Sequence, residues 1–133
     1  MNNTKAILIT ACVLGALAIG GCARSGAAIQ NVNDMPVAGS VKPLSAAEVR
    51  SAIIAAGAGL GWQVVDAGPG NLAGTIALRA HTAVVDIPYS ANKYSIVYKS
   101  SVNLNEKDGS IHPNYNSWVV NLNNAIRQEI ARR

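Results

Sequence analysis

The sequence predicts an α+β fold in which a helix, a four-stranded antiparallel meander and a second helix follow one another. Two observations lead to this class. Apolar residues recur at helical spacing after Ser45 and again towards the carboxyl terminus, and the stretches between them alternate apolar and polar residues. Each element has one apolar face that must be buried against another element. We therefore expect one domain over residues 43–133, with the two helices packed on one face of the sheet.

The first helix is predicted over residues 45–58. Ser45 and Glu48 have the spacing of a capping box, in which the serine hydroxyl accepts an early backbone N–H and the glutamate reaches back to the cap. The apolar residues that follow at helical spacing are Val49, Ile53, Ala56 and Leu60. Three glycines are expected to end this helix, Gly57, Gly59 and Gly61. Their order does not suit a nucleotide-binding loop, which follows a strand and opens a helix.

Four strands are predicted after this helix, because apolar and polar residues alternate with a period of two. They cover residues 62–66, 72–79, 83–89 and 94–99. Turn-forming residues separate the first two strands at 68–71 and the last two at 90–93. The boundary between the middle two, near residues 80–82, contains neither Gly nor Pro. Such short connections favour an antiparallel meander.

The second helix runs to the carboxyl terminus and is expected to be capped by Asn114 or Asn116. Its apolar stripe comprises Trp118, Leu122 and Ala125, with Val119, Ile126 and Ile130 beside them. Basic residues occupy its last turns, where cations suit the helix dipole: Arg127, Arg132 and Arg133. Since the chain has no phenylalanine, we expect Trp62 and Trp118 to be the two bulky side chains of the core.

The amino-terminal segment has the pattern of a secretory signal. Lys5 is followed by an uncharged stretch over 6–21. That stretch is shorter than the roughly 20 residues that span a bilayer as a helix. It ends in Gly20-Gly21-Cys22, which resembles the lipobox of bacterial lipoproteins. The resemblance implies a signal peptide over residues 1–21, a diacylglycerol on the Cys22 thiol and an acylated new amino terminus. Two acyl chains are enough for stable anchoring to a membrane.

Two other interpretations of this segment compete with a lipobox at Cys22. Ile9-Thr10-Ala11-Cys12 also loosely resembles a lipobox, but cleavage there would leave too short an apolar region after Lys5. The whole segment could instead be an uncleaved membrane anchor. In the lipoproteins that the chain resembles, aspartate after the cysteine favours the inner membrane. Ala23 stands there in this sequence, which indicates the inner leaflet of the outer membrane, facing the periplasm.

Residues 22–42 are predicted to form a lipidated flexible tether, because they are small and polar with no regular apolar period. The alternative is that residues 29–37 add an edge strand to the sheet. Cys12 would leave with the signal and Cys22 would carry lipid, so the domain would have no disulfide and would be a monomer. A formal charge of +4, spread along the chain, is too diffuse for a nucleic-acid-binding surface.

Several landmarks of residues 45–130 resemble those of a family of small uncharacterised proteobacterial lipoproteins. They are Gly61-Trp62, Arg79-Ala80-His81, Val85-Asp86-Ile87-Pro88-Tyr89, Tyr94-Ser95-Ile96-Val97-Tyr98, Ser101-Val102-Asn103-Leu104 and Ile111-His112-Pro113-Asn114-Tyr115-Asn116-Ser117-Trp118. The resemblance implies a small helix-and-sheet domain in the cell envelope. It implies no enzymatic activity.

No catalytic, cofactor or metal motif is recognisable, so the sequence predicts a protein that is not an enzyme. His81 and His112 lack metal-binding partners at short spacing, and a Ser101–His112 pair or an approach of Asp66 to Asp86 is weak evidence for catalysis. Two functions remain open. One is a lipid-anchored module that binds an envelope protein or peptidoglycan. The other is a periplasmic domain that binds a small ligand, with the polar loop over residues 100–116 as the mouth of a pocket lined by tyrosines.

The segment over residues 100–116 is the predicted interaction surface, because loops longer than about 12–15 residues are usually functional or disordered. Its candidate site residues are His112, Tyr115 and Asn116, at the start of the second helix, where free backbone N–H groups attract acidic groups. The alternative is structural: His112 and Tyr115 would hold the loop to the sheet through hydrogen bonds.

Overall fold

The computed structural model describes residues 26–133. The predicted signal peptide and the predicted lipidation site, Cys22, lie outside the described residues. The elements in chain order are β1 (Ala27–Ala28), β2 (Val32–Pro36), α1 (Ala46–Gly59), β3 (Gln63–Asp66), β4 (Asn71–Leu78), β5 (His81–Pro88), β6 (Lys93–Val102), β7 (Ser110–Ile111) and α2 (Pro113–Ala131). The predicted α+β class is confirmed.

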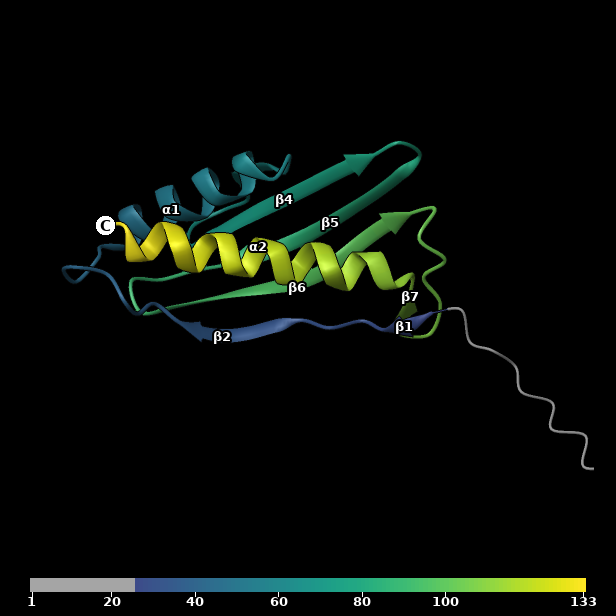
Figure 1. The fold of residues 1–133 in the computed structure, drawn as a ribbon, viewed down its shortest axis with the longest axis horizontal. Coiled ribbons are helices and arrows are strands. Elements are labelled where there is room, and N and C mark those ends of the chain that lie inside the picture. The colour runs from purple at the N-terminus through teal and green to yellow at the C-terminus, as the bar shows by residue number, and fades with distance from the viewer. Residues whose placement is uncertain (1–25) are drawn as a thin grey trace, which may run out of the picture.

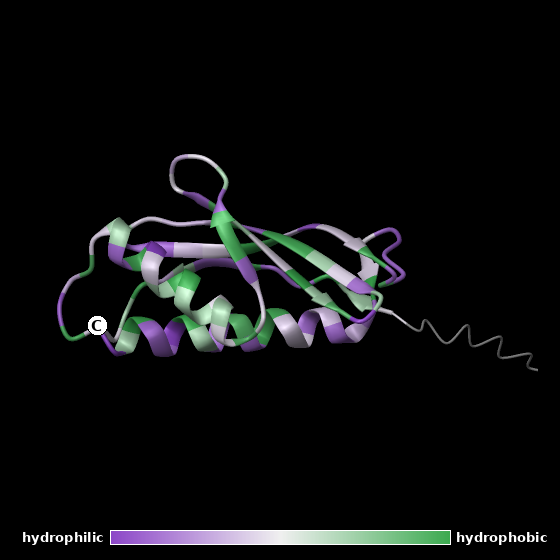
Figure 2. Cartoon of the chain, turned by 90° about the horizontal axis from the view of Figure 1, so that it is seen from above, coloured by the Kyte–Doolittle hydropathy of each residue, from purple (hydrophilic) through white to green (hydrophobic). Residues whose placement is uncertain are grey.

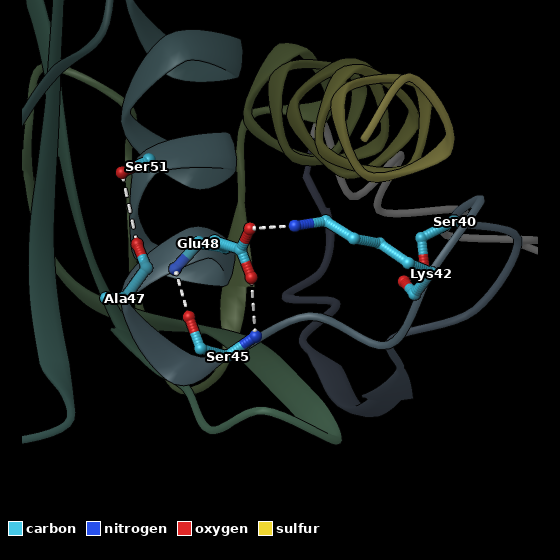
Figure 3. Close-up of polar contacts among 6 residues, drawn as sticks. All are labelled: Ser40, Lys42, Ser45, Ala47, Glu48 and Ser51. Carbon is cyan, nitrogen blue, oxygen red and sulfur yellow. Dashed lines mark hydrogen bonds and ion pairs between the residues drawn. The ribbon is translucent and has the colours of Figure 1, made fainter.

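The helix α1 begins as predicted. The Ser45 hydroxyl accepts the Glu48 N–H at 3.2 Å, and the Glu48 carboxylate accepts the Ser45 N–H at 2.9 Å, so both halves of the capping box are present (Figure 3). Lys42 adds an ion pair to the same carboxylate at 2.9 Å. Gly61, with φ +84°, follows the helix in the left-handed conformation that commonly ends helices.

The sheet contains one strand more than predicted. The strands β3, β4, β5 and β6 form the expected antiparallel meander, but β2 pairs with β6, which gives a five-stranded sheet of order β2-β6-β5-β4-β3. A separate two-stranded sheet joins β1 to β7. The boundary between the middle two strands of the meander, which contains neither Gly nor Pro, is a tight hairpin. Leu78 pairs with His81 there, and Arg79 adopts a positive φ of 57°.

The predicted tether is therefore wrong over 32–36, where the edge-strand alternative describes the chain correctly. The Asn31 side chain accepts the Tyr98 N–H at 2.9 Å, and Val32 lies opposite Ile96 in β6. A register shift between Val32 and Met35 interrupts the pairing. This irregularity breaks the period of two, which is why the strand is invisible as an alternating pattern.

Both helices lie on the same side of the sheet, as predicted, and they pack against each other (Figures 1 and 2). The strand residues that face the helices are buried, whereas the opposite face, with Thr75, Val84 and Val97, is half-buried. Tyr94 and Tyr115 are the largest fully buried side chains. Among residues 26–133, no helix is both long and apolar enough to cross a membrane.

Only one of the two tryptophans has the predicted place in the core. Trp62 is 4% exposed, but Trp118 is half-buried. The centre of the apolar stripe of α2 is formed by Val119, Leu122, Ile126 and Ile130. Trp118 precedes Val119 by one residue, which is about 100° around a helix, so its ring lies at the edge of the stripe.

Candidate functional site

The predicted interaction loop is much shorter than its sequence suggested. The strand β6 continues to Val102, β7 occupies Ser110–Ile111, and α2 already begins at Pro113. Lys107 and Ser110 exchange two backbone hydrogen bonds of 2.9 Å, which close the tip of the remaining turn. The length of the connection therefore no longer argues for a functional loop.

Tyr115 cannot contribute to an interaction surface because its side chain is fully buried. Its ring meets the ring of Tyr98 edge-on, with 5.4 Å between centroids. Burial raises the pKa of the Tyr115 hydroxyl well above its usual value. The hydroxyl oxygen has no hydrogen-bond partner among the described residues. The contacts of this tyrosine are thus those of core packing.

His112 and Asn116 hold the chain together at the start of α2. His112, not Asn114 or Asn116, caps the helix: its Nδ1 accepts the Asn114 N–H at 3.2 Å, and Pro113 occupies the first turn, where a missing N–H costs nothing. Asn116 donates to the Ala28 carbonyl at 2.8 Å and accepts the Gln30 N–H at 3.1 Å. Its amide thus joins α2 to β1 and to the segment that follows β1.

The side chains of the two pairs considered for catalysis, Asp66 with Asp86 and Ser101 with His112, contact other partners instead. Asp66 accepts two hydrogen bonds from Arg50, at 2.8 and 2.6 Å, which lower the pKa of the Asp66 carboxyl. Asp86 pairs with Lys99 instead, at 3.6 Å. The Ser101 hydroxyl lies 2.9 Å from the Tyr98 hydroxyl rather than on a histidine. Within residues 26–133, no three His, Cys, Asp or Glu side chains are grouped as metal ligands would be.

A groove that sequence reasoning missed lies between the connection after β2 and the second half of α2. One part, of about 400 Å³, is lined by Ala38, Gly39, Asn124, Arg127, Gln128 and Ala131. An adjoining part, of about 310 Å³, shares Ala38, Gly39 and Arg127 and adds Met35, Pro36 and Ile130. From the sequence, Arg127 is expected only as a cation that suits the helix dipole.

Arg127 gives this groove its chemistry. No acidic side chain within residues 26–133 forms an ion pair with its guanidinium, whereas Arg50 and Arg132 each have a carboxylate partner. Gly39, with φ +85° and open space where a Cβ would stand, leaves backbone accessible on the opposite wall. Two amide side chains, Asn124 and Gln128, complete the polar lining. A guanidinium beside amides suits a carboxylate, which accepts two hydrogen bonds from the planar fork of arginine.

Tyr94 forms part of the buried support beneath α2. Its hydroxyl donates to the Asn123 side-chain oxygen at 2.6 Å. Burial raises the pKa of the Tyr94 hydroxyl to about 12, while the charge of Arg127 acts in the opposite direction. The Arg127 side chain itself is exposed on the surface of α2.

A second, apolar depression lies beyond the end of α1. It has a volume of about 100 Å³ and is lined by Leu60, Trp62, Ile76, Leu78, Trp118 and Asn121. Leu60 and Leu78 are 41% and 45% exposed, so the cleft has an apolar rim. It contains no side chain that would perform acid–base chemistry. This cleft can contact apolar groups but offers little specificity.

Comparison with known proteins adds no further assignment. No family model, curated protein or solved structure matches this chain.

Proposed function

We propose that this chain is a lipid-anchored protein of the bacterial cell envelope that acts by binding, and that its groove at Arg127 receives a carboxylate-bearing partner. The observation that carries the binding role is the guanidinium of Arg127, which lines both parts of the groove without an acidic partner among residues 26–133. A guanidinium without an acidic partner is available to bind the carboxylate of a ligand. Acidic peptides occur on envelope proteins and in the peptidoglycan stem, and either supplies the required carboxylate.

The lipid anchor is proposed from the sequence. Gly20-Gly21-Cys22 at the end of an uncharged stretch supports cleavage before Cys22 and acylation of its thiol. Ala23 supports an address in the inner leaflet of the outer membrane. The likeness to small proteobacterial lipoproteins, carried by the landmarks over 45–130, belongs to the same proposal.

The small-ligand alternative has weaker support. It requires a polar loop over 100–116 as the mouth of a pocket lined by tyrosines. In the fold, β6 and β7 occupy much of that segment and Tyr115 is buried. The groove at Arg127 has two adjoining parts and is lined by small residues and long polar side chains, which suits an extended acidic peptide better than a compact ligand.

The groove can be tested with isolated peptidoglycan sacculi. Arg127→Gln should weaken retention of the purified protein on sacculi about tenfold or more, because hydrogen bonds to charged groups contribute roughly 1.5–3 kcal/mol. Arg132→Gln is the matched control, since Arg132 is the C-cap of the same helix but already pairs with Glu129 at 2.7 Å. Sacculi with amidated carboxyl groups should not retain the unaltered protein.

The outcomes of this experiment separate the parts of the proposal. Equal retention of Arg127→Gln and Arg132→Gln would remove the groove as the binding site. Failure of the unaltered protein to bind sacculi would exclude the cell wall, and carboxylates of envelope proteins would then be the partner to test by crosslinking at the groove.

The anchor is tested by labelling growing cells with a fatty-acid probe. Cys22→Ala should abolish incorporation and leave uncleaved precursor, because the thiol is the proposed acyl acceptor. Cys12→Ala is the control and should label as strongly as the unaltered chain. Labelling that persists in Cys22→Ala, or that is lost only in Cys12→Ala, would contradict the assignment.

A further inference from the structure

The folded domain begins very close to the proposed anchor. Gly26 is already packed: a Cβ placed on it would lie 3.3 Å from the Ile111 carbonyl oxygen and the Ser110 hydroxyl. The pairing of β1 with β7 follows at once, at Ala27 and Ala28. Four residue steps separate Cys22 from Gly26, and a fully extended chain covers at most about 14 Å over that length. A lipid on Cys22 would thus hold one particular end of the domain near the membrane.

That end, here named the anchor end, is formed by β1, β7, the β4–β5 hairpin tip at 78–81 and the segment 102–109. Figure 1 shows these parts together at the end where the described chain begins, with the carboxyl terminus at the opposite end. Hydrogen bonds hold them together. The Asn103 side chain donates to the Ala80 carbonyl at 2.7 Å, and Ile29 donates to the Gly109 carbonyl at 2.8 Å.

The exposed side chains of the anchor end are apolar as well as polar. Leu78, at the end of β4, is 45% exposed, and Val102, at the end of β6, is 57% exposed. Leu78 also forms the rim of the apolar cleft that contains Trp118. Four charged side chains are exposed here, and their formal charges cancel: Arg79, Glu106, Lys107 and Asp108.

We propose that the anchor end rests on the phospholipid headgroups of the membrane that holds the lipid, with Leu78 and Val102 in contact with the bilayer surface. The proposal depends on anchoring at Cys22, since the short link brings this end and no other to the membrane. Apolar side chains gain free energy at the interface, whereas the balanced charges give little attraction to anionic lipids. The contact should therefore be insensitive to salt.

This placement also orients the proposed binding groove. The groove adjoins α2 near Ala131, at the end of the molecule that carries the carboxyl terminus (Figure 1). With the anchor end on the membrane, the groove faces away from the bilayer. A partner in the periplasm could then reach Arg127 while the protein stays on the membrane.

Site-specific fluorescence tests the contact in the full-length protein, processed in cells and reconstituted into phosphatidylethanolamine–phosphatidylglycerol vesicles. Leu78→Cys and Val102→Cys each carry an environment-sensitive dye, and Val41→Cys is the matched control. Val41 is 87% exposed and lies in the connection between β2 and α1, away from the anchor end. Lipids with a nitroxide headgroup should quench both anchor-end dyes several-fold more strongly than the control, at low and high salt alike.

Equal quenching at the three positions would overturn the contact, even with the lipid in place. Dyes at Leu78→Cys and Val102→Cys that are shielded from water-soluble quencher but untouched by the lipid nitroxide would indicate a protein covering this surface, which also overturns it. Mass analysis of the amino-terminal peptide distinguishes these results from failure of the anchor: without acylation, the proposed function falls and this contact falls with it.

Discussion

The two ends of the domain use their polar groups in opposite ways. At the anchor end, backbone and side-chain groups bond to one another: His81 and Asn103 link the hairpin to the segment after β6, and Asn116 holds β1. At the groove end, formed by residues 37–42 and the last turns of α2, Arg127 faces a hollow without an acidic partner among the described residues.

This difference explains why the residues that the sequence singles out, at 112–116, are not those that line the groove. Histidine, tyrosine and asparagine at 112–116 are residue types that often form sites, but here the fold uses them for capping, packing and bridging. Arg127 is an unremarkable helical residue in the sequence, and its environment comes from a segment more than eighty residues earlier in the chain. The following substitutions measure how much side-chain burial and hydrogen bonding contribute to stability in different parts of the domain.

The largest expected effect concerns the two tryptophans beside the apolar cleft. Trp62→Ala should destabilise the domain by about 3–5 kcal/mol, as expected for a buried tryptophan. Trp118→Ala should cost only about 1–2 kcal/mol, because part of its ring remains in water and less apolar area is lost. Urea unfolding of both variants gives the comparison, and equal costs would show that the cleft is closed rather than open.

Two glycines in the last turn of α1 should respond in opposite directions. A Cβ on Gly57 would lie 2.5 Å from a methyl carbon of Val64, so Gly57→Ala should cost about 1–3 kcal/mol through overpacking. Gly59 has open space around it, and Gly59→Ala should stabilise by about 0.5–1 kcal/mol through its higher helix propensity. Thermal unfolding measures both. A stabilising Gly57→Ala would mean that α1 is not pressed against β3.

The hydrogen bonds of Asn116 at the anchor end should contribute less to the free energy of unfolding. Asn116→Ala removes one hydrogen bond to Ala28 in β1 and one to Gln30 after it, and should cost about 1–2 kcal/mol. Hydrogen exchange at the Gln30 amide should accelerate most, since that N–H loses its acceptor. Asn114→Ala is the control, because the Asn114 side chain is exposed on the same helix turn. Unchanged exchange at Gln30 would contradict a bonded amino-terminal segment.

The smallest expected effect is the pH dependence of the stability that Glu48 contributes at the start of α1. Hydrogen bonding from the Ser45 backbone, and then from Lys42, lowers the pKa of the Glu48 carboxyl from 4.5 to about 2. The unfolded chain therefore takes up this proton first as pH falls. The contribution of Glu48 is fully present above about pH 4.5 and is lost as pH falls towards 2.

Glu48→Gln keeps the capping geometry but removes the charge, so its stability should decline less steeply with acid over this interval. Denaturation midpoints measured between about pH 5 and about pH 2 provide the check, because this interval contains the two pKa values of Glu48. Asp66→Asn is a useful companion, since Arg50 lowers the pKa of the Asp66 carboxyl in the same direction. Parallel curves for Glu48→Gln and the unaltered protein would exclude a stabilising capping carboxylate.

The sequence by itself determined the elements whose signals are local. Ser45 and Glu48 are three residues apart and form their capping box within one helical turn. The alternation that produced β3 to β6 likewise depends on neighbouring residues, since successive side chains of a strand point to opposite faces. These local patterns are enough to predict the α+β class and the packing of both helices on one face of the sheet, and the structure agrees.

Tertiary structure alone decided the features that depend on distant partners. Asn116 bonds to residues 86 and 88 positions away, and β2 joins the sheet only because β6 offers an unpaired edge. The burial of Tyr115 and the groove at Arg127 arise in the same way, from segments that meet after folding. An amino acid's type is present in the sequence, but its exposure and its free hydrogen-bonding groups depend on what the rest of the chain places beside it.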